Sequence, residues 1–375
     1  MASAEVLGIP GLPGGAFNTY NDSSFSPSQE SMTRSYATFV GMDSSIDELP
    51  TRASHFDANK HLVYEGPTKV HTMEDIGLQA SNGVSPIAVS EPFRLFSKEA
   101  IMEMRKEIFA ENVLNKYCYQ SDIAPMQLRG YAPKEAKFIY DAWKSPKTLA
   151  ILSEIAGVDL VPVIDYEIGH INISKPGNRQ DANEAALDVD DDDKAVVDWH
   201  RDSYPFVCVL MMSDTTNMVG GETALKAGNG EIRKVRGPEI GCAVVLQGRY
   251  IDHQALRAFG GQERITMVTS LRPKSPFVRD DTVLNTVRPI SNLPDLYGQT
   301  IEYSLENMEA RLRRMLKKVR LDMKAGVTDV TAYKKHFDFE IQTLQRLNHE
   351  IVEEHKVTKG RVADEIEAER KAREI

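Results

Sequence analysis

The chain has 375 residues and a mass of 41.9 kDa, and 41% of its residues are hydrophobic while 27% are charged. This composition excludes a fibrous or wholly disordered protein and leaves ample apolar material for a core. The formal net charge of −10 would repel a phosphate backbone, so it argues against nucleic-acid binding and favours a small-molecule substrate.

The cysteines and the apolar segments bear on location. Cys118, Cys208 and Cys242 are odd in number and widely spaced, so they predict neither a disulfide framework nor a cysteine-based zinc site. The first residues lack a basic region followed by an apolar run, and no segment approaches the roughly 20 apolar residues that a membrane span needs. We therefore expect a cytoplasmic protein without membrane segments.

Helical patterns follow a polar N-terminal region. Residues 1–45 are rich in Ser, Gly, Pro and Asn without periodicity, which predicts a disordered leader. SKEAIMEMRKEIF has helical spacing behind a capping serine, Ser97. APKEAKFIYDAW over 132–143 predicts a second helix, and SPKTLAILSEIAG predicts a third that ends at Gly157.

After Gly157 the pattern changes to short β-rich runs separated by turn residues. The runs are VPVIDYEIGHINI, PFVCVLMM, GGETALKA, GCAVVLQGRYI and ERITMVTSL. Because no helices intervene, they favour an antiparallel barrel or sandwich, and the predicted fold class is mainly β with flanking helices (α+β). Between the first two runs, ALDVDDDDKAVVD over 186–198 predicts a solvated acidic loop.

The C-terminal region is helical again. One predicted apolar face consists of Leu305, Met308, Leu312, Met315, Leu316, Val319 and Met323. A second amphipathic stretch runs over 333–351, and the charged residues 361–375 predict a solvated helical tail. We therefore expect a main domain over 46–300 and a helical extension over 301–375, through which a homo-oligomer would form.

Three H-x-D triplets raise the question of a metal site, and they serve as controls for one another. They are His55-Phe-Asp57, His200-Arg-Asp202 and His336-Phe-Asp338. Residues two apart point to the same side of an extended segment but to different sides of a helix. Only the pair of His200 and Asp202, just before a β run, meets this requirement near other candidate ligands.

A third ligand is available in His253, which closes the run GCAVVLQGRYIDH about fifty residues later. An antiparallel barrel can return the chain over that distance, so His253 can lie beside His200 and Asp202. Two imidazoles and one carboxylate on one face of an octahedral ion leave three positions open, as in non-haem Fe(II) oxygen chemistry. Zinc with the same ligands is a second interpretation.

An expected anion site follows the last ligand. Arg264 opens a β run, and Thr266 shares its face because side chains alternate along a strand. A guanidinium at the end of a barrel is costly to bury unless an anion meets it, and a carboxylate is its natural bidentate partner. The spacing predicts that one diacid reaches from the metal to Arg264.

These residues resemble the Fe(II)/2-oxoglutarate-dependent oxygenases. His200-Arg-Asp202, His253 and Arg264-Ile-Thr266 match the H-x-D, distal H and R-x-S/T elements of that family in order, and GGET over 220–223 resembles its interstrand turn. The resemblance covers about residues 160–275 and implies a double-stranded β-helix, the jelly-roll core, inside an oxygenase domain over 46–300. It also implies the cofactors Fe(II), 2-oxoglutarate and O2, with Arg264 and Thr266 on the distal carboxylate.

Further site candidates come from the strand IDYEIGHINI and from the neighbourhood of the ligands. The side chains that we expect to alternate onto one barrel face, near the cosubstrate or substrate, are those of Tyr166, Ile168, His170 and Asn172. The alternative is that His170 and Asn172 are hydrogen-bonded wall residues or face solvent. Tyr204 and Arg249 are expected at the cavity mouth, and Asp198 and Glu222 are reserve carboxylates.

The reaction implied by the resemblance is oxidative decarboxylation of 2-oxoglutarate coupled to hydroxylation, desaturation or cyclisation of a small molecule. A free amino acid or a secondary-metabolite intermediate is the expected substrate, because the layout resembles fungal biosynthetic members that oxidise free amino acids. Two other hypotheses stay open. One is a cupin-like metal-dependent isomerase or hydrolase that does not use 2-oxoglutarate, and the other is a non-catalytic scaffold.

Overall fold

The computed structural model describes residues 55–121, 126–174, 195–235, 239–260 and 263–360. The predicted leader over 1–45, the acidic residues 186–194 and the predicted tail over 361–375 lie outside these described residues. Among the helices that the structure does describe, none has an apolar stretch that could cross a membrane.

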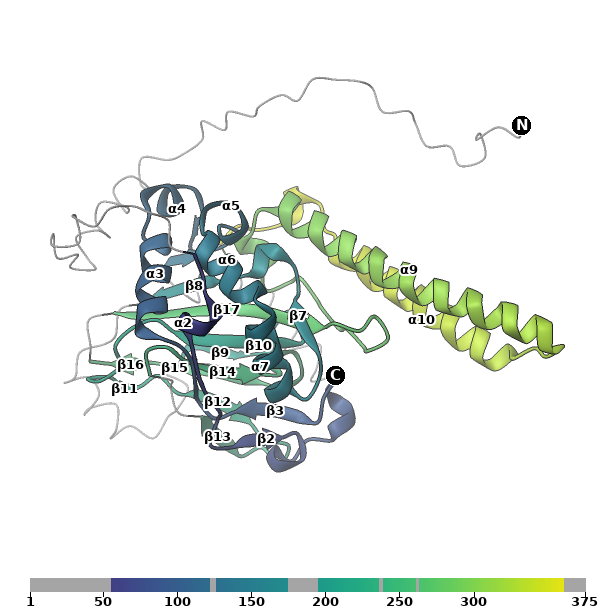
Figure 1. The fold of residues 1–375 in the computed structure, drawn as a ribbon, viewed down its shortest axis with the longest axis horizontal. Helices are drawn as coiled ribbons and strands as arrows, with labels where there is room; N and C mark the ends of the chain where they lie inside the picture. Colours follow the sequence, from purple (N-terminus) through teal and green to yellow (C-terminus); the bar gives the residue numbers. More distant parts are fainter. Residues whose placement is uncertain (1–54, 122–125, 175–194, 236–238, 261–262, 361–375) are drawn as a thin grey trace, which may run out of the picture. The chain divides into compact units, whose positions relative to one another are not determined.

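A large antiparallel sheet forms one layer (Figure 1). Its main path runs β1 (Leu62–Glu65), β4 (Phe93–Phe96), β14 (Cys242–Leu246), β10 (Phe206–Met211), β17 (Arg264–Pro273), β8 (His170–Ser174), β6 (Met126–Leu128) and β5 (Cys118–Tyr119). Beside this path lie β2 (Val70–Thr72), β3 (Ile87–Ser90) and β7 (Leu160–Pro162). The ten residues of β17 are the longest strand, and they pair with β10, β8 and β7.

A second sheet faces this layer. It contains β13 (Ile232–Val235), β12 (Thr223–Lys226), β15 (His253–Leu256) and β9 (Ala195–His200), and β11 (Val219–Gly220) pairs with β16 (Ala258–Phe259) nearby. Apolar side chains of both sheets belong to one buried cluster, with Val207 and Leu246 from the large sheet and Leu225 and Val235 from the small one. One core cluster therefore lies between two antiparallel sheets, and with the helices the class is α+β.

Helices cover the other face of the large sheet (Figure 1): α3 (Lys98–Ile108), α4 (Glu111–Lys116), α5 (Ala132–Glu135), α6 (Lys137–Lys144) and α7 (Pro146–Ala156). Trp143 of α6 donates from its indole nitrogen to the sulfur of Met267 on β17, 3.1 Å away. The predicted Ser97 cap is present, since its hydroxyl accepts from the Ala100 N–H, and Gly157 ends α7 in the left-handed conformation.

The single helix predicted over 132–143 is wrong, because the chain breaks at Ala136 into α5 and α6. The carboxylate of Glu107 on α3 accepts from the N–H groups of Phe138 and Ile139, at 2.8 and 2.9 Å. A side chain from another helix thus satisfies the first turn of α6, which no local pattern could reveal.

Three strand predictions also need correction. Tyr166 and Ile168 do not lie on a strand, because Asp165–Glu167 form a 3-10 turn and Gly169 has a φ of +70°, so β8 begins only at His170. The run that starts at Cys242 ends at Leu246, and His253 opens β15 instead of closing that run. The acidic loop predicted to reach residue 198 ends earlier, since β9 begins at Ala195.

Two long helices follow, α9 (Leu293–Ala325) and α10 (Val330–Glu350), and they form an antiparallel hairpin (Figure 1). Asn292 caps α9, and Leu296 and Tyr303 of its first turns are buried, so the predicted boundary at residue 300 falls inside this helix. Of the predicted apolar face, Met308 is buried, whereas Leu305 and Leu312 remain exposed. The remaining short helices are α2 (Ala58–His61), η2 (Glu74–Ile76), η3 (Ala80–Asn82), η4 (Asp165–Glu167), η6 (Gly248–Tyr250), η7 (Arg288–Ile290) and η8 (Glu354–Lys356).

Candidate functional site

The structure brings His200, Asp202 and His253 together. His200 ends β9, His253 begins β15, and the two are cross-strand partners whose ring centroids lie 4.3 Å apart. Oδ1 of Asp202 lies 3.7 Å from Nε2 of His200 and 3.6 Å from Nε2 of His253. One ligand atom from each residue lies within 4.8 Å of the other two, so this cluster could hold a metal ion.

Backbone groups orient two of these side chains. Nδ1 of His253 lies 3.0 Å from the carbonyl of Ile251. A proton on Nδ1 satisfies that carbonyl and leaves Nε2 free to bind a metal, which is the usual arrangement of a ligating histidine. The N–H of Asp202 donates to the carbonyl of Gly248, which fixes the start of the loop after β9.

The carboxylate of Asp202 fits a metal ligand. Its Oδ2 is buried and has no hydrogen-bond partner among the described residues. A Cβ on Gly248 would lie 1.8 Å from this oxygen, so the absence of a side chain there makes room for the carboxylate. A buried, unpartnered carboxylate oxygen beside two imidazoles is the donor set that suits a divalent transition metal.

The carboxylate and the imidazoles of the cluster stabilise one another's charged forms. Burial opposes ionisation of Asp202, but His253 and His200 outweigh it and hold the pKa of this carboxyl below its usual value. Burial likewise opposes the charged form of His253, and Asp202 outweighs it and raises the pKa of this imidazole. The acid is therefore ionised in the form that binds metals.

An ion pair joins the two ligand-bearing segments from the side. Arg201, between His200 and Asp202, donates to both carboxylate oxygens of Asp252, the residue before His253, at 3.1 and 2.9 Å. Such a bidentate pair has a defined geometry, so it limits relative motion of the two segments. Arg249 donates to the carbonyls of Asp281 and Asp202, at 3.0 and 3.4 Å.

Arg264 is the first residue of β17 and lies beside the glycine turn before β12. A Cβ on Gly221 would lie 3.5 Å from its Nε, so the turn approaches the guanidinium closely. Burial lowers the pKa of Arg264, and the described residues give it neither an ion pair nor a hydrogen bond. A largely desolvated guanidinium without a protein anion is suited to an anionic ligand.

Thr266 extends the face of β17 that carries Arg264. Its side chain is buried, and in the register of the sheet it lies opposite Asn172 of β8, which in turn lies opposite Gln127 of β6. Nε2 of Gln127 donates to Oδ1 of Asn172 at 2.9 Å. Cross-strand partners point to the same side of a sheet, so these four polar side chains share one face.

His170 belongs to the same face and links it to a second network, since its Nε2 lies 3.2 Å from Nε2 of Gln127. Arg129 donates to its Nδ1 at 2.9 Å and forms a buried ion pair with Glu167, which also accepts from the hydroxyl of Tyr204. Burial, with a further contribution from Arg129, lowers the pKa of His170 well below its usual value. The ring is therefore neutral near pH 7.

Other predicted site residues lie elsewhere. Tyr166 lies in η4, where its hydroxyl accepts from the N–H of Asn292 and its ring contacts Arg129. The prediction that Tyr204 lies at a cavity mouth is wrong, because its side chain is 1% exposed and held by Glu167. Glu222 is not part of the metal cluster, and the side chain of Asp198 lies outside what the structure describes.

Several residues of the site escaped the sequence pattern. Gly248, Gln127 and Arg129 lie in segments without a motif, and only their tertiary partners give them a role. For the pair of Arg129 and Glu167, the sequence signal was that each is a charged residue in a largely apolar stretch.

No protein-family model and no curated protein sequence matches the chain. Among solved structures, it is similar to a Pseudomonas putida prolyl-4-hydroxylase, with 15% identity, a TM-score of 0.30, and coverage of 48% of this chain and 88% of that one. It is also similar to an oxidoreductase of the 2OG-Fe(II) oxygenase family from Burkholderia pseudomallei (14% identity, TM-score 0.28, 41% and 65% coverage). A third is SnoN, a non-heme alpha ketoglutarate dependent epimerase from nogalamycin biosynthesis (14% identity, TM-score 0.33, 47% and 72% coverage).

Proposed function

We propose that the protein is an Fe(II)/2-oxoglutarate-dependent oxygenase that acts on a small molecule and whose two sheets form a double-stranded β-helix. The observation that carries the proposal is the combination, on connected segments, of the metal cluster and of Arg264, which has no anionic partner among the residues that the structure describes. Gly221 lies against Arg264, and four residues later Leu225 of β12 pairs with His253.

In this proposal each side chain has a defined task. His200, Asp202 and His253 would hold Fe(II) and leave three coordination positions open. Arg264 and Thr266 would bind the distal carboxylate of 2-oxoglutarate, and Asn172 with Gln127 would orient the cosubstrate or the substrate from the adjacent strands. Iron with 2-oxoglutarate and O2 supplies the oxidation, which ends in hydroxylation, desaturation or cyclisation of the substrate.

The proposed substrate class is a free amino acid or a secondary-metabolite intermediate. The net charge of −10 supports a small molecule over a nucleic acid. The polar side chains of His170, Asn172 and Gln127 on one face support a substrate with hydrogen-bonding groups. The likeness to fungal members stays a prediction.

Anaerobic titration of the iron-loaded protein with 2-oxoglutarate tests the proposal. We expect a visible metal-to-ligand charge-transfer band in the wild type. Arg264→Ala should weaken 2-oxoglutarate binding by roughly tenfold or more, because a charge-assisted bidentate contact is lost. His253→Ala should abolish iron binding. His55→Ala, which alters an exposed H-x-D histidine outside the cluster, should behave like the wild type.

Two results would contradict the proposal in different ways. Iron binding without any band would leave a metal site that does not use 2-oxoglutarate, as in a cupin-like isomerase or hydrolase. Failure of the wild type to bind Fe(II) would reject an iron enzyme altogether. Once the band is established, succinate release across a panel of amino acids and secondary-metabolite intermediates would identify the substrate.

A further inference from the structure

The α9–α10 hairpin carries two exposed apolar stripes that the proposed chemistry does not use. The stripe of α9 contains Leu305, Leu312, Leu316 and Met323, which are 48%, 44%, 49% and 74% exposed. The stripe of α10 contains Val330, Phe337, Ile341 and Leu344, which are 57%, 51%, 52% and 47% exposed. Within each helix the spacings of three, four and seven residues place the four side chains on one face.

Both stripes lie on the same side of the hairpin. The residues of α9 that contact α10 include Arg311, which is paired with Glu340, and Asp322, which accepts from Tyr333. We view each helix from its own N-terminus and count 3.6 residues per turn. The stripe of α9 then lies roughly 120° clockwise of the residues that contact α10, and the stripe of α10 lies roughly 60° clockwise of the residues that contact α9. Because the helices are antiparallel, rotations of the same sense bring both stripes to one side, so the hairpin presents one apolar face two helices wide.

The stripe of α9, and that of α10 apart from Ile341, are also symmetric about one level of the hairpin. In α9, Leu305 and Met323 are equally far from residue 314, as are Leu312 and Leu316. In α10, Val330 and Leu344 are equally far from Phe337. Arg311 pairs with Glu340 and Lys318 lies over the ring of Tyr333, so residue 314 lies level with Phe337 across the hairpin. A single twofold axis at this level would place each stripe against its own copy, as an isologous interface requires.

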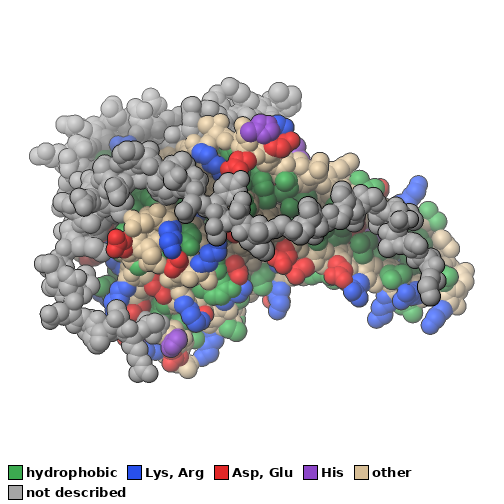
Figure 2. All heavy atoms as spheres, turned by 90° about the horizontal axis from the view of Figure 1, so that it is seen from above, with side chains coloured by type: hydrophobic (Ala, Val, Ile, Leu, Met, Phe, Trp, Pro, Cys, Tyr) green, Lys and Arg blue, Asp and Glu red, His purple; other side chains and the backbone are tan. Residues whose placement is uncertain are grey.

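The charges beside the stripe of α9 are complementary under the same axis. Before its midpoint come the exposed Glu302, Glu306 and Glu309, and after it come the exposed Lys317, Arg320 and Lys324. Figure 2 shows acidic side chains along the part of the hairpin nearer the sheets and basic ones toward its tip. Antiparallel packing of α9 on a second α9 sets each acidic group near a basic one, whereas packing on α10 of the second copy would set Lys317 level with Lys334.

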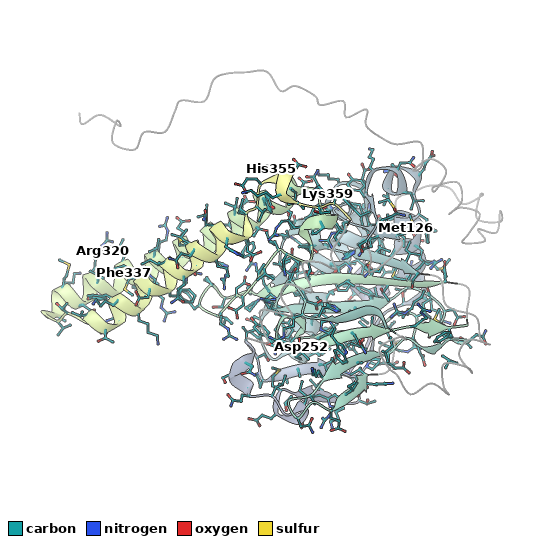
Figure 3. The ribbon with its side chains drawn as sticks, turned by 180° about the vertical axis from the view of Figure 1, so that it is seen from behind. Met126, Asp252, Arg320, Phe337, His355 and Lys359 are labelled. Atoms are coloured by element: carbon teal, nitrogen blue, oxygen red, sulfur yellow. The ribbon has the colours of Figure 1, made fainter. Side chains whose placement is uncertain are left out.

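We propose that this face is an interface between two copies of the chain, in which α9 packs antiparallel on α9 and α10 on α10 to form a four-helix bundle. Figure 3 labels Arg320 of α9 and Phe337 of α10, which lie on neighbouring stretches of the two helices. From Leu305 to Met323 the face is about 27 Å long, and two helices make it about 20 Å wide. Two such faces bury roughly 1,000 Å² in total, which reaches the lower range of specific interfaces.

Sedimentation velocity of the full-length protein over a concentration series tests the association. The wild type should be a dimer. Leu312→Asp should raise the dissociation constant about 100-fold or more, because it buries a charge at the centre of the interface. Met102→Asp is the matched control, since Met102 on α3 is exposed to a similar degree, at 49%, and should leave the dimer intact. Unchanged thermal unfolding of both variants would show that they fold.

Charge exchange tests the antiparallel orientation. Glu306→Lys and Arg320→Glu should each weaken the homodimer about tenfold, because two facing pairs become repulsive. Mixing these two variants should restore dimers, since every facing pair in the heterodimer is again opposite in charge. Combining both substitutions in one chain should also restore them. A monomeric wild type, a dimer indifferent to Leu312→Asp, or the lack of restoration on mixing would each overturn the proposal.

Discussion

Among single residues, Gly248 matters to the candidate metal cluster because it has no side chain. Gly248 approaches Asp202 so closely that a Cβ would lie 1.8 Å from its Oδ2. The carboxylate of Asp202 occupies this space, and its backbone N–H bonds to the carbonyl of the same glycine. The position of the acid is therefore set by a residue that cannot itself bind a metal.

Gly248→Ala should displace the carboxylate of Asp202 and weaken Fe(II) or Mn(II) binding by about tenfold or more, which is typical of changes next to a ligand. Isothermal titration calorimetry under anaerobic conditions measures this affinity. Gly298→Ala is a suitable control, because a Cβ at Gly298 meets nothing within 4 Å. Equal affinities of the two variants would show that the cluster does not need this space.

At the scale of elements, a glutamine fixes the segment before β3 to the end of β14. Gln247 is fully buried, its Oε1 accepts from the N–H of Val84 at 2.7 Å, and its Nε2 donates to the carbonyls of Ser85 and Ile87. Gln247 directly precedes Gly248, so the same anchor holds the turn on which Asp202 rests. These bonds satisfy backbone groups that no strand partner reaches.

Gln247→Ala should lower the free energy of unfolding by about 3 kcal/mol, because it leaves buried backbone donors and acceptors without partners. Urea unfolding followed by circular dichroism measures the difference. Gln345→Ala on the exposed face of α10 should change stability by less than about 0.5 kcal/mol. A small effect of the Gln247 substitution would mean that water replaces its bonds.

The sequence predicted the helices and strands correctly where periodicity determines them. It failed where a contact with a distant residue determines the start or end of an element. The helices at Ser97 and Gly157 carry their own cap residues, and β17 is defined by alternation. The break at Ala136 depends on Glu107, about thirty residues earlier, and β9 lies beside an acidic run that obscured it. For the site, the types and order of His200, Asp202 and His253 were visible, whereas the role of Gly248 depends on a tertiary contact.

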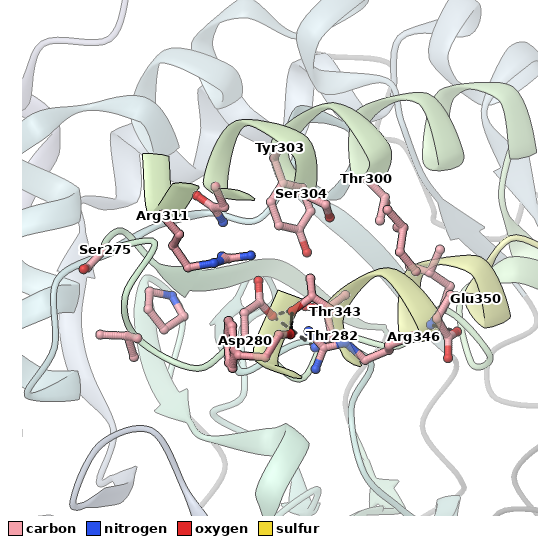
Figure 4. Close-up of a pocket in the computed structure, with 16 residues that line it drawn as sticks. Ser275, Asp280, Thr282, Thr300, Tyr303, Ser304, Arg311, Thr343, Arg346 and Glu350 are labelled. Atoms are coloured by element: carbon pink, nitrogen blue, oxygen red, sulfur yellow. Dashed lines mark hydrogen bonds between the residues drawn. The ribbon is translucent and has the colours of Figure 1, made fainter. Parts of the chain in front are cut away.

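At the scale of the whole molecule, buried ion pairs tie the helical hairpin together and to the rest of the chain. Arg311 of α9 pairs with Glu340 of α10, and Arg288 of η7 pairs with Glu350 at the end of α10. Glu350 also accepts from the N–H of Leu284 at 2.7 Å. Figure 4 shows Arg311 and Glu350 lining one pocket together with Tyr303.

Glu350→Gln should destabilise the protein by about 3 kcal/mol, because the buried charge of Arg288 would lose the carboxylate of Glu350. Hydrogen exchange should rise first at the end of α10 and at Leu284, where the contacts are lost. Glu353→Gln is the control, since the side chain of Glu353 is 62% exposed and its pair with Lys356 contributes little. Uniform exchange across α10 in both variants would exclude this anchoring role.

The pairing of β9 with β15 has an irregularity that limits which changes in sequence length the metal cluster tolerates. His200 lies opposite His253 and Val197 opposite Ala255, so β9 uses three residues where β15 uses two. The extra residue changes the side to which the next one points. Point substitutions within this stretch leave that geometry in place. Deletion of one residue from this part of β9 would instead turn the imidazole of His200 to the other side of the sheet and separate it from that of His253, while the two strands still pair.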